Sequence, residues 1–240
     1  MQHVHARVIG RTSKALLIGT AMSLAAGLAA AHVSISSGPG FADKNQEITF
    51  GVGHGCGTSD TYSVRVEIPS SVTSVRVMPS EFGKATIEKA ASGLITAVTW
   101  QKADADLLAA DNAYYKVGLR IRVPNQPFTA IHFPTRQTCK SADGGVSVVD
   151  WVAETESPDG GGPEPAPELR ILPARQPGWN KFTVPAAVAD LSVWFSDALI
   201  VWKDSAAYSF NSNIAEQIDG TAGVTKLTSL AANDVIWVKY

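Results

Sequence analysis

Residues 115–124 read Tyr-Lys-Val-Gly-Leu-Arg-Ile-Arg-Val-Pro, and this stretch decides the fold class. Apolar side chains occupy every second position as far as Val123, polar or small residues lie between them, and Pro124 ends the run. Strict alternation over such a length is typical of a strand with one buried face in an antiparallel sheet. The stretch therefore predicts a half-buried β-strand.

The same alternation recurs on both sides of this strand, in runs that Gly or Pro residues terminate. These runs cover residues 48–52, 64–68, 72–77, 94–100, 131–133 and 146–151. Only residues 103–113 show a briefly helical pattern. The succession of short strands predicts an all-β protein in which residues 32–173 form an immunoglobulin-like β-sandwich.

The last quarter of the chain differs in composition from the predicted sandwich. Residues 157–167 are rich in Gly and Pro and predict a linker or a long loop. Four of the six tryptophans then lie within residues 175–240. Strands are predicted there at Leu191–Phe195, Ala198–Trp202, Val224–Leu230 and Val235–Tyr240. Residues 174–240 are therefore predicted to form a small Trp-rich all-β module that leans on the sandwich for stability.

The first 31 residues have the composition of a signal peptide. Basic residues precede an apolar run at 16–28, and Ala29-Ala30-Ala31 fits the small-x-small pattern of a cleavage site. The apolar run is shorter than the roughly 20 residues that a membrane-spanning helix needs. We therefore expect cleavage after Ala31, a periplasmic or secreted protein, and no membrane span after processing.

The charge balance excludes one large class of function. The chain has 20 basic and 22 acidic side chains, and removal of residues 1–31 would leave 17 basic against 22 acidic, or −5. Nucleic-acid binding through phosphate neutralisation needs clustered Lys and Arg, so no nucleic-acid partner is expected. The sequence also contains no GxSxG, HExxH, GxGxxG or P-loop motif, and we therefore expect no enzymatic activity.

Cleavage after Ala31 would make His32 the first residue of the mature protein. Its free α-amine and its imidazole Nδ1 can close a six-membered chelate ring on one metal ion. These groups lose their protons near pH 8 and 6.5, so a metal ion competes with protons at neutral pH. Nitrogen ligands favour Cu(II), which also heads the affinity series of divalent first-row metals. An N-terminal His that merely follows a cleavage site is the alternative reading.

The two cysteines, Cys56 and Cys139, are expected to form a structural disulfide. An exported protein favours a bridge, and a redox-active pair usually has the closer spacing CxxC. We expect the bridge to join the loop after the 48–52 strand to the loop before the 146–151 strand.

Several short motifs occur in the order found in a known family. They are His54-Gly55-Cys56 before the strand Val64–Pro69, the run Ser74–Pro79, Cys139 followed by a strand ending in Trp151, and Pro165–Leu169. Over residues 32–173 the chain resembles the YcnI-like copper-binding family of exported bacterial proteins. The C-terminal module lies outside this resemblance.

The resemblance implies an immunoglobulin-like sandwich that holds one copper ion, and the nitrogen ligands favour Cu(II) over Cu(I). The ligands would be the amine and imidazole of His32 and a carboxylate, with Trp151 close to the metal. Relatives often carry an acidic residue shortly after the His, where this chain has Ser36-Ser37-Gly38-Pro39. The open alternatives for the carboxylate are Asp43, Glu47, Asp150 and Glu154. The expected function is copper trafficking, buffering or storage, with an exported copper chaperone or a membrane copper protein as partner.

Three other side chains with ligand chemistry have plainer interpretations. His54 is either a second imidazole ligand or a loop residue that supports its turn. His132 is interpreted as a solvated strand residue, and Met78 as a packing residue rather than a thioether ligand.

Two further functions remain open from the sequence. One is a copper oxygenase with a histidine brace, in which His54 or His132 adds a third nitrogen to those of His32. The other is a cell-envelope module without metal, in which the aromatic C-terminal unit contacts a polymer or a protein.

Overall fold

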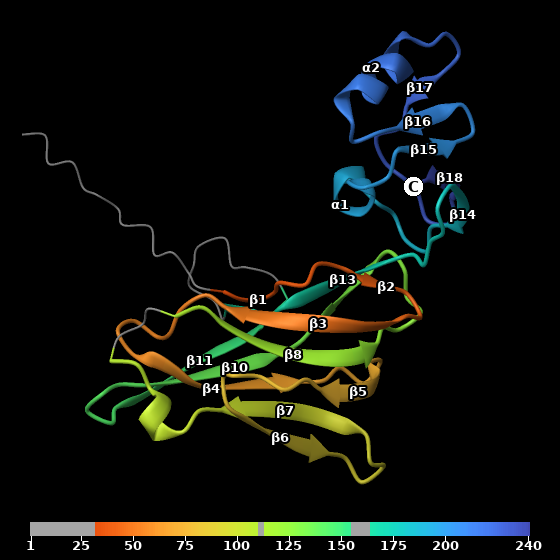
Figure 1. Ribbon diagram of the computed structural model, residues 1–240. Helices are drawn as coiled ribbons and strands as arrows, with labels where there is room; N and C mark the ends of the chain where they lie inside the picture. Colours follow the sequence, from red (N-terminus) through yellow and green to blue (C-terminus); the bar gives the residue numbers. More distant parts are fainter. Residues whose placement is uncertain (1–31, 110–112, 155–163) are drawn as a thin grey trace, which may run out of the picture. The chain divides into compact units, whose positions relative to one another are not determined.

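The computed structural model describes residues 32–109, 113–154 and 164–240 (Figure 1). The predicted signal peptide and the Gly-rich part of the predicted linker lie outside the described residues. The structure is built mainly of short strands, as the sequence predicts.

Two larger sheets and one smaller sheet form the N-terminal domain. The first has the order β1 (Val33–Ile35), β3 (Asn45–Val52), β8 (Tyr115–Arg122) and β5 (Thr73–Val77). The second has the order β12 (Glu164–Pro165), β11 (Val146–Ala153), β10 (Thr135–Lys140), β4 (Asp60–Glu67), β7 (Ile95–Gln101) and β6 (Lys84–Lys89). The third contains β2 (Gly40–Phe41), β13 (Glu168–Leu172) and β9 (Thr129–His132).

One hydrophobic core joins these sheets. Phe50 of β3 meets Phe133, which follows β9, with ring centroids 5.4 Å apart in an edge-to-face arrangement. Val64 of β4 and Trp100 of β7 are fully buried in the same cluster. Alternate residues of β3, β4 and β8 enter this core, because successive side chains of a strand point to opposite faces. The predicted fold class, an all-β immunoglobulin-like sandwich, is confirmed.

The C-terminal residues form a five-stranded sheet with a hydrophobic cluster of its own. Its order is β14 (Trp179–Thr183), β18 (Val235–Lys239), β15 (Ile200–Lys203), β16 (Ala206–Tyr208) and β17 (Thr225–Lys226). Two helices, α1 (Leu191–Phe195) and α2 (Ser212–Gly220), accompany the sheet. Phe128, from the loop between β8 and β9, belongs to this second cluster.

Two of the strands predicted in this region are wrong in detail. Leu191–Phe195 is helical, because Asp190 accepts a hydrogen bond from the backbone N–H of Ser192 and caps the first turn. The apolar pair Leu191 and Phe195 is then buried on one side, at the spacing of a helix. Of the predicted strand Val224–Leu230, only Thr225–Lys226 pairs as β17. A 3₁₀ turn, Asp104–Asp106, lies in the stretch of briefly helical pattern.

Candidate metal site

The ring of His32 lies beside the ring of Trp151. The two ring centroids are 5.7 Å apart and the rings are tilted by 58°. His32 comes directly before β1, whose first residue, Val33, is buried and pairs with Val52 of β3. Trp151 belongs to β11 of the other large sheet. The fold thus brings together two side chains that the resemblance assigns to one site.

Trp151 is fixed by a buried hydrogen-bond network that sequence reasoning missed. It is only 4% exposed, and its indole N–H donates to Oε1 of Gln137 at 3.2 Å. The side-chain amide of Gln137 donates in turn to the backbone oxygen of His54 at 2.8 Å and to Oγ1 of Thr61 at 2.9 Å. Because every buried polar atom of the amide has a partner, the network holds the indole in one orientation.

The loop that contains His54 is held by the disulfide between Cys56 and Cys139. The bridge is confirmed, with a Cα–Cα distance of 5.8 Å. Cys139 lies within β10 rather than in the loop that we expected, and it is two residues from Gln137 on the same face of the strand. The disulfide and Gln137 therefore both connect β10 to the loop between β3 and β4.

Two of the four expected carboxylates are engaged by arginines. Asp150 accepts two hydrogen bonds from Arg136, at 2.6 and 3.1 Å, and these bonds hold the pKa of Asp150 below its ordinary value. Asp43 accepts a hydrogen bond of 2.7 Å from Arg122. Each of these two carboxylates is therefore already paired with an arginine side chain on the protein surface.

The other two expected carboxylates are exposed. Glu47 lies on β3 opposite Arg120, five positions before Val52, which is the partner of Val33 at the His32 end. Glu154 follows the last residue of β11.

A fifth carboxylate, Glu164, lies nearer to the indole in the sheet register. Strand β12 pairs in parallel with β11, and Glu164 is the Cα partner of Trp151. Partners in register present their side chains on the same face of a sheet. Sequence alone does not reveal Glu164, because residues 157–167 have the composition of a linker and no local pattern marks its pairing with Trp151.

The remaining candidate ligands have partners elsewhere in the fold. Nδ1 of His54 lies 2.7 Å from the backbone oxygen of Gly55, within its own loop. Nε2 of His132 lies 3.6 Å from Oε2 of Glu168 on the neighbouring strand. Met78 packs with its sulfur against the backbone of Gly118, in agreement with its interpretation as a packing residue. Among the described residues, no three His, Cys, Asp or Glu side chains gather as a metal cluster.

The family model described as a domain of unknown function, DUF1775, matches residues 32–171. The chain belongs to the DUF1775 family. The DUF1775 domain therefore has nearly the boundaries of the β-sandwich that the alternation of apolar residues predicts. No curated protein matches the chain.

Solved structures with similarity to the chain are distant. An uncharacterized protein from Nocardia farcinica, reported with an immunoglobulin-like fold, has 24% identity and a TM-score of 0.47, covering 59% of this chain and 98% of its own. BcpA, the major pilin subunit of Bacillus cereus, has 10% identity and a TM-score of 0.33, covering 84% of this chain and 52% of its own. Within the described residues, no helix has the length and apolar character needed to cross a membrane.

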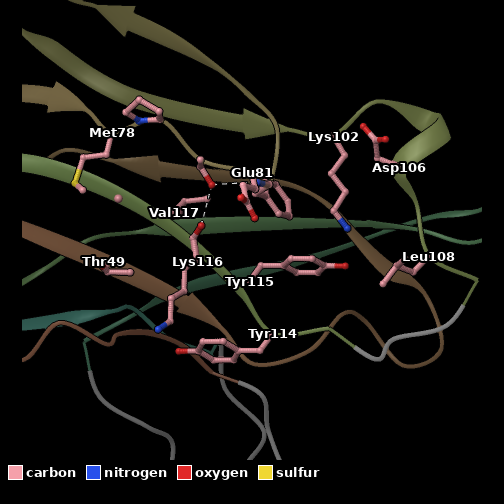
Figure 2. A pocket seen from close by; sticks show the side chains of 14 residues that line it. Thr49, Met78, Glu81, Lys102, Asp106, Leu108, Tyr114, Tyr115, Lys116 and Val117 are labelled. Carbon is pink, nitrogen blue, oxygen red and sulfur yellow. Dashed lines mark hydrogen bonds between the residues drawn. The ribbon is translucent and has the colours of Figure 1, made fainter.

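A hollow of about 660 Å³ in the DUF1775 domain lies beside the first residues of β8 (Figure 2). Its wall includes Lys102 and Tyr115, which both contact the buried Asp60. Nζ of Lys102 is 2.6 Å from Oδ2 of Asp60, and the hydroxyl of Tyr115 donates to Oδ1 at 2.7 Å. Because Asp60 neutralises Lys102 inside the fold, we assign this ion pair to stability rather than to ligand binding.

Proposed function

We propose that the DUF1775 domain binds one copper ion as Cu(II), through the α-amine and the imidazole of His32, once cleavage after Ala31 has freed the amine. The observation that carries this proposal is the contact of the His32 ring with Trp151, at 5.7 Å between centroids. The resemblance to YcnI-like proteins implies a tryptophan beside an N-terminal His, and membership of DUF1775 supports that resemblance.

The potential metal ligands of the domain suit a site built on an N-terminal His. The described residues contain no cluster of three His, Cys, Asp or Glu side chains, so a site made of side chains alone is not preassembled there. An N-terminal His supplies two nitrogen ligands from one residue, and one carboxylate then brings the number of ligands to three. We assign the carboxylate to Glu164, because it is the register partner of Trp151.

The indole of Trp151 shapes the surroundings of the ion without binding it. Held by Gln137, it presents an apolar ring next to the imidazole of His32 and excludes water from that side. His32 itself is half-buried at the start of an edge strand. An ion held at the end of a strand is accessible to a second protein, which suits trafficking, buffering or storage of copper without catalytic turnover.

The direct test is a copper titration of protein that begins at His32, with a competing chelator and electron paramagnetic resonance. The wild type should bind one Cu(II), and His32→Ala should lose tight binding. A matched control carries an acetyl group on the α-amine of His32, which leaves the imidazole intact but removes the nitrogen that closes the chelate ring. The proposal fails if His32→Ala binds equimolar Cu(II) as tightly as the wild type.

Two further variants separate the ligand sets. Glu164→Gln should weaken Cu(II) binding at least tenfold, whereas Glu154→Gln, an exposed carboxylate at the end of β11, should not. His54→Ala should retain binding. Loss of binding in His54→Ala as complete as in His32→Ala would favour the three-nitrogen brace of an oxygenase instead.

A further inference from the structure

Three tryptophans share the outer face of the C-terminal sheet. In the register of β14, β18 and β15, Trp202 is directly opposite Trp237, and Trp179 is opposite Lys239, two residues from Trp237. Opposite and diagonal neighbours in an antiparallel sheet lie within about 5 and 8 Å of one another. The three indoles are therefore adjacent, and we call Trp179, Trp202 and Trp237 the indole face.

The indole face is not part of the hydrophobic core of its module. The alternate residues of the same strands, Val201, Ile236 and Val238, are fully buried and supply that core. Trp179 and Trp237 are 51% and 48% exposed. Exposing large aromatic rings to water is unfavourable, so an adjacent group of them indicates a binding surface.

The indoles line a shallow hollow of about 500 Å³ together with Asp204. Asp204 is exposed in the turn between β15 and β16, and it has a positive φ of 51°. An Asp tolerates this left-handed conformation better than most residues. The turn thus places a hydrogen-bond acceptor at the border of the aromatic surface.

Two lysines supply hydrogen-bond donors at the same surface. Nζ of Lys181 lies 5.7 Å from the ring centroid of Trp237, and Nζ of Lys239 lies 5.9 Å from that of Trp179. At these distances each ammonium group is attracted to its ring. The face therefore combines aromatic rings with donors and an acceptor of hydrogen bonds.

We propose that the indole face binds a glycan strand of β-1,4-linked N-acetylglucosamine units. Sugars of this configuration present axial C–H groups on flat faces that stack on indole rings. Their acetamido groups offer an N–H to the carboxylate of Asp204 and a carbonyl to Lys181 or Lys239. Such a strand matches both the apolar hollow between the indoles and the polar groups beside it. The proposal does not depend on copper binding.

Two other occupants fit the surface less well. Three strands of about five residues cover roughly 17 by 10 Å, whereas a stable protein interface buries about 800 Å² on each partner. An anionic membrane would be attracted by Lys181 and Lys239 but repelled by Asp204, and of these three residues Asp204 is the one that lines the hollow between the indoles. A narrow, flat and uncharged chain remains as the occupant that the surface favours.

The test is calorimetric titration of the full exported chain with the N-acetylglucosamine hexamer, in a buffer that contains a metal chelator. We expect saturable binding, and we expect Trp237→Ala and Trp179→Ala each to weaken it at least tenfold. Val235→Ala is the matched control, because Val235 is exposed on the same face but does not line the hollow. Circular dichroism of each variant checks that the module has folded.

Three results would overturn the proposal. The first is no binding of the hexamer at about 10 mM. The second is equal or tighter binding of the β-1,4-linked glucose hexamer, which would remove the role of the acetamido group. The third is co-sedimentation with phosphatidylglycerol vesicles that Trp237→Ala abolishes, without hexamer binding, which would assign the face to a membrane. Retained copper binding in the tryptophan variants would show that the two sites are independent.

Discussion

At the scale of a single residue, Asp60 is a charged group buried inside the sandwich. It is 1% exposed and accepts hydrogen bonds from Lys102, from the hydroxyl of Tyr115 and from the backbone N–H of Leu108. Burial by itself raises the pKa of Asp60, but these hydrogen bonds and the charge of Lys102 lower the pKa to below its ordinary value. The carboxylate therefore stays ionised inside the sandwich.

This depressed pKa predicts a loss of stability in acid. A carboxyl group whose pKa is lower in the folded than in the unfolded protein stabilises the fold fully above its unfolded pKa, about 3.9. That contribution is lost as the pH falls from this value through the folded pKa. Asp60→Asn should abolish this part of the pH dependence, as measured by urea unfolding at several pH values between 7 and 2.

The same variant should also lower the free energy of unfolding at pH 7 by about 3–5 kcal/mol, because Lys102 would be buried without its partner. Asp43→Asn is the control, since its contact with Arg122 is exposed and should contribute about 1 kcal/mol or less. The double variant Asp60→Asn, Lys102→Met should recover part of the loss. An unchanged acid slope in Asp60→Asn would contradict this account.

Gln137 is predicted to be the residue that positions Trp151. Gln137→Leu removes the acceptor of the indole N–H and the donor to His54 and Thr61, each loss of a buried partner costing about 1–3 kcal/mol. Chemical denaturation and Trp fluorescence should show lower stability and a changed indole environment. Gln101→Leu, at an exposed position, should change the free energy of unfolding by about 0.5 kcal/mol or less.

At the scale of an element, the turn that follows β3 tolerates no extra atom at Gly55. A Cβ built there would lie 1.9 Å from the backbone oxygen of Ser59, which pairs with Cys56. At Gly51, in contrast, the nearest atom is the hydroxyl of Tyr114, the end of an exposed side chain that can rotate away. An added side chain therefore meets fixed backbone at Gly55 but a movable side chain at Gly51.

We expect Gly55→Ala to destabilise the protein by about 1–3 kcal/mol, as overpacking commonly does, and Gly51→Ala to cost less. Thermal unfolding of both variants measures the difference. Because the Gly55 turn leads into Cys56, disulfide formation in Gly55→Ala should also be slower during oxidative refolding. Equal stability of the two variants would show that the turn adjusts more easily than its geometry indicates.

At the scale of the molecule, copper binding to the folded state predicts a shift in the melting temperature. Free Cu(II) at about 100 times its Kd should add about 2.7 kcal/mol. For a protein of this size that corresponds to a rise of about 5–10 °C. Differential scanning calorimetry should show the rise in protein that begins at His32 and its absence in His32→Ala. The same rise in the variant would place the bound copper elsewhere.

The fold class follows from the sequence because alternation of side chains is a local property of a strand. The stretch Tyr115–Arg122 shows it plainly, and this stretch is strand β8. The disulfide was predicted from the number of cysteines and the expected compartment. Leu191–Phe195 was predicted wrongly, because five apolar residues suit a strand as well as a short helix, and the cap at Asp190 decides between them.

The candidate site is likewise predicted by the sequence only in part. The chelating power of His32 is a property of one residue and its cleavage site, so the sequence suffices to propose it. Only the tertiary structure places Trp151 beside that residue, Gln137 behind the indole, and Glu164 in register with it. These three residues belong to the six-stranded sheet, whereas His32 precedes a strand of the four-stranded sheet, and Glu164 pairs with a residue 13 positions before it. No local sequence pattern encodes such contacts, because they depend on how the two sheets pack and on the register between their strands.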